Sequence, residues 1–428
     1  MRFVLATFGT RGETDPYIAL AFELQRRGHE VLLITTEEYE SRARAFGIHV
    51  HCVPGSVKAS LQSHEHRDVW AGRRDAGEKW KKWYRTFFLP TFRRLLDAIW
   101  ESSQRTEVLV LHSGLMPAQR VAEIHHIPVF IACPYPVLSA TRHFANPFLP
   151  QLNFVPFFNR LSYTLNRLYP LGQYRVVADW YRTALRVSPP TRYHNYLKQN
   201  GRQLPVLYCY SEMLIPSPPD WDRSICVSGY WSLPVDTTWL PPQALLDYLQ
   251  SGPPPVFIGF SSTIGPSPEK MTELVAKAIR EIPHRVIVGG GWGGLHNVNL
   301  PDSAFFVENV PHQWLFPYLS VVVHHGGTGT LAAAIKAGRP SVICPLGAEQ
   351  AFWAAAAHRK GVAPPFRMQH KLTAEWLVNS VKTTLSTPSM ARAAEELGHK
   401  LREEDSFGKA VEFIERNVEA WTRNAPAI

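Results

Sequence analysis

The chain of 428 residues is 45% hydrophobic, 12% aromatic and 19% charged, a composition that excludes an intrinsically disordered protein. Its length exceeds what one hydrophobic core ordinarily supports and predicts two or three domains. The net charge of +9 is unevenly placed, because residues 1–200 hold 26 basic against 16 acidic residues and residues 201–428 hold 19 against 20.

The N-terminal residues predict a strand, a turn, a helix and a second strand, in the order FVLATF, GTRGETDP, YIALAFELQRRGHE and VLLITT. The helix is expected to stop at Gly28 and to begin near Pro16, where Asp15 could serve as its cap. Two apolar strands joined by one helix form a βαβ unit and indicate a parallel sheet. No targeting segment is expected at the N-terminus, because its apolar run is too short for a secretory signal.

Residues 58–94 hold the densest part of the basic excess, with Lys and Arg interleaved among Trp, Tyr and Phe. Such a segment can contact an anionic membrane surface or a nucleic acid. It can equally form a solvated amphipathic helix whose aromatic face is buried. Nucleic acid is the least favoured partner, so a buried aromatic face and peripheral membrane contact stay open.

A proline-rich segment divides two series of strands. The first series continues through VLVLH, PVFIAC and PVLYCY, and the second runs through PVFIGFSS, a helix over 268–281, RVIVGG, AFFVEN, VVVHH, TLAAAIKAG and SVICP. The predicted fold class is α/β, with two doubly wound Rossmann-like domains facing a central cleft that holds the ligands. The expected divisions are a first domain over 1–215, a linker with the first strand of the second domain (ICVSG) over 216–255, a second domain over 256–405, and a C-terminal helix over 406–428 that packs toward the first domain.

The strongest local signal is VVVHHGGTGTLAAAIKAG (321–338), a buried strand that runs through His324 and His325 into a glycine-rich turn and a helix. Glycines allow the backbone to approach an anion, and the helix N-terminus offers free N–H groups and a partial positive charge. The hydroxyl of Thr328 or Thr330 can add a donor or cap the helix. Taken alone, the same pattern also fits a tight turn without a ligand.

Segments in both halves of the chain resemble the two-domain (GT-B fold) glycosyltransferases, and most of all the sterol glucosyltransferases and the bacterial glycosyltransferases of antibiotic aglycons. The segments are FVLATFGTRGETDPYIALAFELQRRGHEV, GFSST (259–263), GGGWGGL (289–295) and NVPHQWLFPYLSVVVHHGGTGTLAAAIKAGRPSVICPLGAEQAFWA (309–354). The resemblance covers roughly residues 1–55 and 225–380. It implies a nucleotide-sugar donor bound by the second domain.

The resemblance assigns donor contacts to matching positions. His324 would reach the donor phosphates with His325 beside it, and Gly326, Gly327, Thr328, Gly329 and Thr330 would cradle the diphosphate. The remaining implied contacts are Ser262 to phosphate, the backbone around Val310 to the uracil edge, Trp292 to the face of the base, and Glu349 with Gln350 to the sugar hydroxyls. Sterol-type relatives have Asp where this chain has Glu349, so the sugar itself stays open between hexoses, with glucose favoured.

The catalytic base is expected in the N-terminal turn. Relatives place an Asp there in a GTRGD-type sequence, and Glu13 takes that position here. Asp15 is the alternative base. Arg11 could approach the diphosphate across the cleft or pair with Glu13 or Asp15, and sequence position does not choose between these.

Two clusters imitate metal sites. Asp220-Trp221-Asp222 has the spacing of a metal-binding DxD motif but lies in the proline-rich segment, where turn and cap chemistry is the expected role. His64, Glu65 and His66 lack a second pair at ligand spacing. No metal and no cofactor are expected, since a helix N-terminus and side chains can stabilise a departing diphosphate.

The predicted function is inverting, metal-independent transfer of a hexose from a UDP-sugar to a hydroxyl of a large apolar acceptor such as a sterol, lipid, carotenoid or polyketide. The aromatic stretch 135–184 would line the acceptor pocket or meet the membrane that holds the acceptor. Transfer of a deoxysugar from a dTDP donor and a catalytically silent partner protein are the alternatives. Five Cys without a C-x-x-C pair predict a reducing, cytoplasmic location, either free or peripheral at the inner membrane face.

Overall fold

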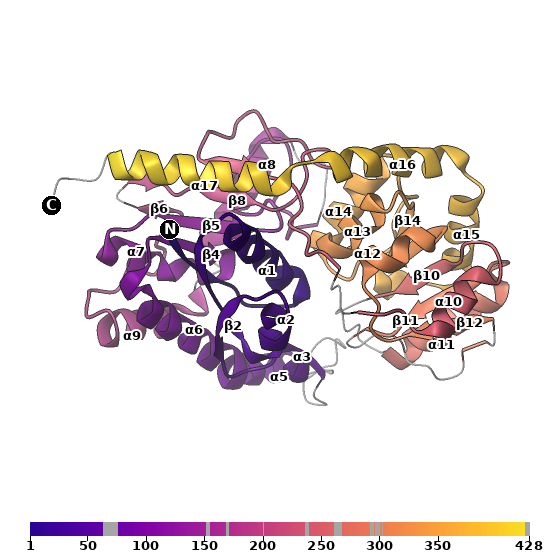
Figure 1. Cartoon of the computed structure of the whole chain (residues 1–428), viewed down its shortest axis with the longest axis horizontal. Helices are drawn as coiled ribbons and strands as arrows, with labels where there is room; N and C mark the ends of the chain where they lie inside the picture. The colour runs from indigo at the N-terminus through magenta and orange to yellow at the C-terminus, as the bar shows by residue number, and fades with distance from the viewer. Residues whose placement is uncertain are drawn as a thin grey trace.

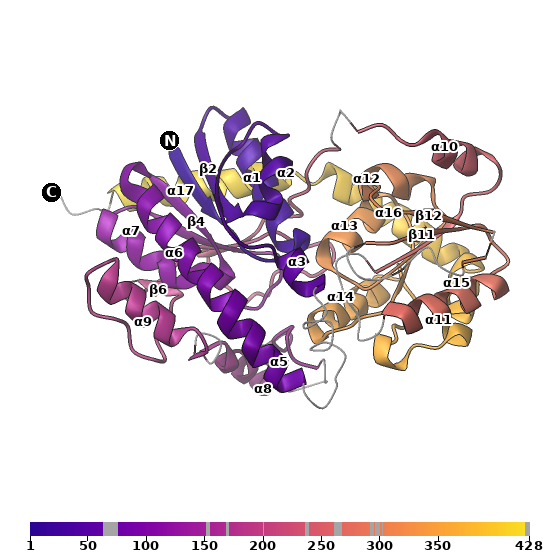
Figure 2. The same ribbon diagram turned by 90° about the horizontal axis from the view of Figure 1, so that it is seen from below.

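The computed structural model describes residues 1–62, 76–150, 155–167, 171–199, 201–235, 239–260, 268–291, 295, 300–301 and 303–423. Two α/β domains lie next to each other along the long axis of the molecule (Figures 1 and 2). Among the described residues, no helix is long and apolar enough to cross a membrane.

The first domain is built on a sheet of seven parallel strands in the order β3-β2-β1-β4-β5-β8-β9. The strands are β1 (Arg2–Ala6), β2 (Glu30–Thr36), β3 (His49–Val53), β4 (Val108–His112), β5 (Val129–Cys133), β8 (Val206–Tyr208) and β9 (Ile225–Val227). The order reverses direction at β1, and such a switch point opens a crevice at the carboxyl ends of the strands.

Helices cover both faces of this sheet. Phe3 and Leu5 of β1 pack with α1 and α17, whereas Val4 and Ala6 pack with α6, as expected when successive side chains of a strand point to opposite faces. The helices of this domain are α1 (Arg11–Arg26), α2 (Glu40–Arg44), α3 (Val57–Gln62), α5 (Ala76–Trp83), α6 (Leu89–Ser102), α7 (Gln119–His125), α8 (Pro156–Ser162) and α9 (Tyr174–Thr183), with a short hairpin of β6 (Lys198–Gln199) and β7 (Arg202–Gln203).

The second domain repeats the pattern on a sheet of five parallel strands in the order β12-β11-β10-β13-β14. Its strands are β10 (Val256–Gly259), β11 (Val286–Gly289), β12 (Ala304–Val307), β13 (Val321–His324) and β14 (Ser341–Ile343). Its helices are α10 (Gln243–Gln250), α11 (Pro268–Glu281), α12 (His312–Leu315), α13 (Thr328–Lys336), α14 (Ala348–Arg359), α15 (Ala374–Leu385) and α16 (Pro388–Glu403). The predicted α/β class with two doubly wound domains is confirmed.

The last helix, α17 (Ser406–Arg423), returns to the first domain and lies across it (yellow in Figure 1). Its buried residues Val411, Phe413 and Ile414 join the core that also holds α1 and β1. The Phe413 ring meets Phe130 of β5 edge to face, with 6.2 Å between ring centroids. The core on this face of the first sheet is therefore completed by residues from the end of the chain.

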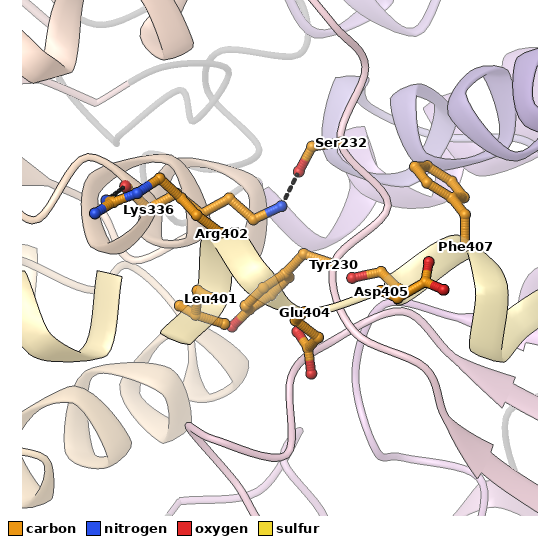
Figure 3. A pocket seen from close by; sticks show the side chains of 9 residues that line it. Tyr230, Ser232, Lys336, Leu401, Arg402, Glu404, Asp405 and Phe407 are labelled. Carbon is orange, nitrogen blue, oxygen red and sulfur yellow. Dashed lines mark hydrogen bonds between the residues drawn. The ribbon is translucent and has the colours of Figure 1, made fainter. Parts of the chain in front are cut away.

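The chain passes between the domains twice, after β9 and between α16 and α17, and a pocket of about 290 Å³ lies where the two passages meet (Figure 3). Lys336 of α13 donates from Nζ to Oγ of Ser232 at 3.1 Å in the first passage. Ser211 of the first domain donates to Oε1 of Glu404 at 3.0 Å in the second passage. Each passage is thus tied by a side chain to one of the domains.

Apolar side chains also join the domains directly. Phe144 of the first domain lies 5.4 Å from Phe352 of α14, and Tyr210 lies 5.5 Å from Trp353 of the same helix, measured between ring centroids. Buried residues of α13 and α14 belong to the same apolar cluster as α6 and β1. This contact places α14 against the part of the first domain that follows β5.

Two boundaries differ from those expected from the sequence. Helix α1 begins at Arg11, not near Pro16, because Thr10 and Glu13 form a capping box that starts it earlier. Pro16 falls in the second turn, where it cannot donate a backbone hydrogen bond to Gly12, and Asp15 is not a cap. The ICVSG strand does not open the second domain, because β9 pairs with β8 at the edge of the first sheet.

The described part of the basic, aromatic segment is largely helical, and its rings stack along one side. Trp80 lies 4.9 Å from Tyr84, Tyr84 lies 4.9 Å from Phe88, and Phe88 lies 5.9 Å from Phe92, between ring centroids. The row runs from Trp80, which is 43% exposed, to Phe92, which is buried in the core. The aromatic row is thus exposed at Trp80, half-buried at Tyr84 and Phe88 and buried only at Phe92, and the choice between the two interpretations stays a prediction.

Candidate active site

A cleft of about 880 Å³ separates the two domains and is lined by both. Its walls come from the loops that follow β1, β5, β12, β13 and β14 and from the carboxyl ends of β10 and β11. Side chains at the carboxyl ends of parallel strands gather at one edge of a sheet, and here two such edges face each other. The cleft is therefore the expected ligand site of this architecture.

The glycine-rich loop after β13 forms part of the second-domain wall of the cleft. Gly326 has φ +91°, and a Cβ there would lie 2.8 Å from Cγ2 of Ile343 and 3.1 Å from the carbonyl oxygen of Gln350. Gly327 is the N-cap of α13, and no side chain of the described residues caps that helix. The free N–H groups of the first turn belong to Thr328, Gly329 and Thr330, all of which line the cleft. This geometry suits a bound anion.

The two histidines of this loop occupy different places. His325 lines the cleft, whereas His324 is fully buried at the end of β13. Nδ1 of His324 accepts the Gly326 N–H at 3.1 Å, and its Nε2 has no partner among the described residues. Burial lowers the pKa of His325 to about 4 and lowers that of His324 further. Both rings are therefore neutral at physiological pH.

Glu13 lies on the opposite wall, in the first turn of α1. Its Oε2 accepts the Thr10 N–H at 2.7 Å, and its Oε1 faces the hydroxyl of Tyr135 at 3.4 Å. Gly9 has φ +143°, and a Cβ there would collide with the Glu13 carboxylate, so this turn requires glycine for both reasons. Burial raises the pKa of Glu13, and the hydrogen bonds from Thr10 and Tyr135 oppose that shift. The side chain is a carboxylate that lines the cleft and is held by Thr10 and Tyr135.

Asp15 is held more tightly in a charge pair. Arg42 donates from Nε to Oδ1 at 2.7 Å and from Nη2 to Oδ2 at 2.9 Å, and Arg11 Nε lies 3.5 Å from Oδ2. Two guanidinium groups therefore occupy both oxygens of this carboxylate. Of the roles left open for Arg11, the structure shows the pairing with Asp15. Arg11 also lines the cleft, and its charge contributes to the lowered pKa of His312 in the second domain.

Glu349 and Gln350 open α14 and line the cleft between the two walls. Oε1 of Glu349 accepts from Trp353 Nε1 at 2.5 Å and from Thr328 Oγ1 at 3.3 Å, and Oε1 of Gln350 accepts the Leu346 N–H at 2.8 Å. Burial, and to a smaller extent the charge of Glu13, raise the pKa of Glu349 to about 7, against the hydrogen bonds from Trp353 and Thr328. The second Glu349 oxygen and the Gln350 amide group are available to adjacent hydroxyls of a sugar.

The other predicted residues are placed as follows. Val310 is half-buried and lines the cleft after β12. Ser262, Trp292 and the His64-Glu65-His66 cluster lie outside the described residues. Asp220 accepts from Thr141 and from the Arg142 N–H, and Asp222 accepts from Ser224, so both carboxylates serve loop turns.

No group of three or more His, Cys, Asp or Glu suited to a metal ion occurs in the part of the chain that the structure describes.

Tyr135 and His312 line the cleft and were not named individually as site residues from the sequence. Tyr135 follows β5, and His312 opens α12, where its ring stacks on Phe316 at 4.5 Å between centroids. Burial lowers the pKa of His312 to about 3. His312 lies inside the NVPHQ segment, so its place after a strand of the second domain was a usable signal. Tyr135 is the first residue of the aromatic stretch 135–184, which was expected to line the acceptor pocket or meet the membrane.

Comparisons with known proteins agree with this architecture. The model of the glycosyltransferase family 28 N-terminal domain matches residues 3–116, and that of the erythromycin biosynthesis protein CIII-like C-terminal domain matches residues 273–411. A sterol 3-beta-glucosyltransferase of Arabidopsis thaliana is 31% identical over 434 residues, covering 99% of this chain and 67% of that protein. The chain belongs to this family of sterol and antibiotic-aglycon glycosyltransferases.

The glycosyltransferase family is also represented among fungi and among solved structures. A sterol 3-beta-glucosyltransferase of Cryptococcus neoformans is 28% identical over 447 residues, covering 98% of this chain but 27% of that protein. The crystal structures of the kitacinnamycin and calicheamicin glycosyltransferases each align with a TM-score of 0.68 at 18% identity, covering 97% and 99% of this chain and 98% and 99% of theirs. The resemblance inferred from the sequence motifs is confirmed, and so is the glycosyltransferase assignment.

Proposed function

We propose that this glycosyltransferase transfers a hexose, glucose before others, from a UDP-sugar to a hydroxyl of a large apolar acceptor, with inversion and without a metal ion. The observation that carries the proposal is the position of the Glu13 carboxylate. It lines the same cleft as the N-terminus of α13 and as Glu349 and Gln350, and Glu349 accepts from Thr328 in the first turn of α13. A base, an anion site and a hydroxyl-binding pair are thus arranged around one cavity.

In the proposed reaction Glu13 removes the proton from the acceptor hydroxyl as its oxygen attacks the anomeric carbon of the sugar. The bond from that carbon to the diphosphate oxygen breaks on the opposite face, which inverts the configuration. The electron pair leaves with the diphosphate, where the N–H groups of Thr328, Gly329 and Thr330 would stabilise the added charge. His325, neutral and facing the cleft, would donate one further hydrogen bond.

Sugar recognition would fall to Glu349 and Gln350, whose side chains are held by Trp353 and by the Leu346 N–H. The proposal of an apolar acceptor is supported by apolar and aromatic side chains that line the first-domain side of the cleft, including Tyr135, Phe148 and Trp231. The sterol 3-beta-glucosyltransferases among the relatives point to a sterol-like acceptor. Five free Cys support a reducing, cytoplasmic location.

A dTDP donor is the second candidate, because one structural neighbour with a TM-score of 0.64 was solved with dTDP bound. Thermal unfolding with UDP and with dTDP separates the two, since a ligand at 100 times its Kd stabilises the folded state by about 2.7 kcal/mol. The proposal predicts a larger rise in Tm with UDP. A larger rise with dTDP would replace the proposed donor.

Turnover is tested by incubation with UDP-glucose and a panel of sterols, carotenoids, polyketides and lipids, followed by mass spectrometry. A gain of one hexose on an apolar acceptor is expected, and chelation by EDTA should leave the rate unchanged. NMR of the product should show the anomeric configuration opposite to that of the donor. Binding of nucleotide without any transfer or donor hydrolysis would instead favour the silent partner protein.

A further inference from the structure

Helix α8 presents its apolar residues to solvent and its polar residues to the protein. Phe157, Phe158 and Leu161 are 68%, 52% and 47% exposed. Asn159 and Ser162 on the same helix are buried. A surface helix of a water-soluble domain normally has the reverse arrangement.

Hydrogen bonds hold the helix in this orientation. Asn159 donates from Nδ2 to the carbonyl oxygen of Arg142 at 3.0 Å, and Ser162 Oγ accepts the Asn146 N–H at 2.8 Å. Rotation of the helix to bury its phenylalanines would break both bonds and leave buried polar groups without partners. The exposed apolar face is therefore a stable feature of this surface.

The apolar surface extends along the chain on both sides of α8 and reaches the cleft. Val155 precedes the helix and is 56% exposed, and Leu165 follows it and is 45% exposed. Phe148 is 53% exposed, lines the cleft, and lies 5.3 Å from the ring of Tyr135, which faces Glu13. We call Phe148, Val155, Phe157, Phe158, Leu161 and Leu165 the α8 surface. It joins the outside of the molecule to the wall that carries the proposed base.

The chain segment that carries the α8 surface is basic, although the carboxylate of Asp220 lies beside it and accepts the Arg142 N–H. Residues 124–178 contain four Arg and no Asp or Glu. Arg142 and Arg160 of this stretch are exposed. An apolar surface rimmed by cations matches the interface of an anionic lipid bilayer.

We infer that the α8 surface docks on an anionic bilayer, so that an apolar acceptor passes from the lipid to the cleft beside Phe148. Aromatic side chains enter the headgroup region of a bilayer, while Arg142 and Arg160 pair with anionic headgroups. A second copy of the chain is a poorer occupant, since a symmetric contact would place each cation rim against its own copy. Docking is independent of the proposed function, whereas acceptor transfer from the bilayer rests on it.

The experiment is flotation of the full chain with vesicles of phosphatidylcholine containing either no anionic lipid or about 30% phosphatidylglycerol at low salt. The wild type should float with the anionic vesicles. A variant with Phe157→Ser and Phe158→Ser should lose at least about tenfold in partition coefficient. Arg160→Gln should lose about fivefold on anionic vesicles only. The matched control is Leu240→Ser, which changes an 81% exposed apolar residue in the segment between the domains.

The inference is overturned if the wild type stays unbound, if the double variant floats like the wild type, or if the Leu240→Ser control loses binding. A wild-type dimer that becomes a monomer in the double variant, by light scattering, would assign the surface to a second copy instead. Circular dichroism and UDP affinity show whether the double variant is folded, and Phe157→Ser alone serves if it is not. With an acceptor that dissolves in water the double variant should turn over like the wild type, but with the same acceptor class in vesicles it should be at least about tenfold slower. Flotation with no turnover in any variant would refute the proposed function and leave docking intact.

Discussion

Replacing Glu13 by Gln tests the proposed base with little disturbance to the fold. Glu13 has a structural role as well, because its Oε2 accepts the Thr10 N–H at 2.7 Å and so starts α1. Gln serves as well as Glu at this position of a capping box, since its amide oxygen accepts the same bond. The substitution therefore removes the proton acceptor and keeps the cap.

The expected magnitudes separate the two roles. Loss of a general base costs about 10²- to 10⁴-fold in rate, which is about 3–5 kcal/mol on the barrier. Loss of a cap costs about 1 kcal/mol of stability, and Gln should cost less than that. Glu13→Gln should thus slow turnover by at least about 100-fold while the Kd for UDP changes by less than about twofold. Initial rates by mass spectrometry and UDP titration by calorimetry measure both quantities.

The control is Asp15→Asn, which breaks the bidentate pair with Arg42 in the same turn. Because this pair is partly exposed, the substitution should cost no more than about 1 kcal/mol of stability and leave turnover within about threefold. The reasoning is refuted if Glu13→Gln keeps near wild-type turnover, and the base moves to Asp15 if Asp15→Asn alone is inactive. Since burial raises the pKa of Glu13, the wild-type rate should fall as pH drops through a value above 4.5, the ordinary value for this carboxyl.

Three further substitutions test the site and the core. Burial raises the pKa of Glu349 to about 7, so the folded state binds the proton more tightly than the unfolded chain, and wild-type stability falls as pH rises from 4.5 to 7. Glu349→Gln should therefore stabilise the protein by about 1–2 kcal/mol at pH 8 and leave its stability unchanged below pH 4.5, as measured by urea unfolding. Trp353→Phe keeps the ring packing but removes the hydrogen bond that fixes Glu349. The KM for the UDP-sugar should therefore rise about tenfold while the affinity for UDP stays unchanged. Equal weakening of UDP-sugar and UDP binding would count against this role of Trp353. Phe413→Ala should lower the free energy of unfolding, measured in urea, by about 3–5 kcal/mol, because it empties a buried site. The control Glu419→Ala, on the exposed face of α17, should lower it by less than about 0.5 kcal/mol. Similar losses for the two variants would contradict the packing described.

Much of the fold follows from local sequence patterns. The helix predicted over 268–281 is α11, and the strand VLVLH is β4 without a shift, because apolar periodicity and strand length are local properties. The start of α1 was wrong, since Pro16 is a familiar start signal and the Thr10–Glu13 capping box was not recognised. The pairing of β9 with β8 was missed because a strand of three residues carries no signal of the sheet that it joins.

The site was predictable where it follows a motif. The cleft that the two βαβ series predicted is lined by residues 327–330 of the glycine-rich loop and by Glu349 and Gln350. The contrast between His324, buried behind the wall, and His325, which faces the cleft, depends on the twist at the end of β13 and was not visible in the sequence. The pairing of Asp15 with Arg42 joins residues 27 apart in the chain, and the Trp353 contact to Glu349 needs the helical turn of α14. Only tertiary structure supplies such contacts.

The return of α17 to the first domain has a consequence for biosynthesis. Strand β1 and helix α1 are synthesised long before the apolar side chains that cover them, Val411, Phe413 and Ile414, which follow about four hundred residues later. Until then one face of the first sheet lacks part of its cover, and the nascent first domain exposes aggregation-prone surface for the entire synthesis of the second. Removal of residues after 405 should leave that state permanent, so the truncated chain is expected to be found with chaperones or in the insoluble fraction of a cell lysate.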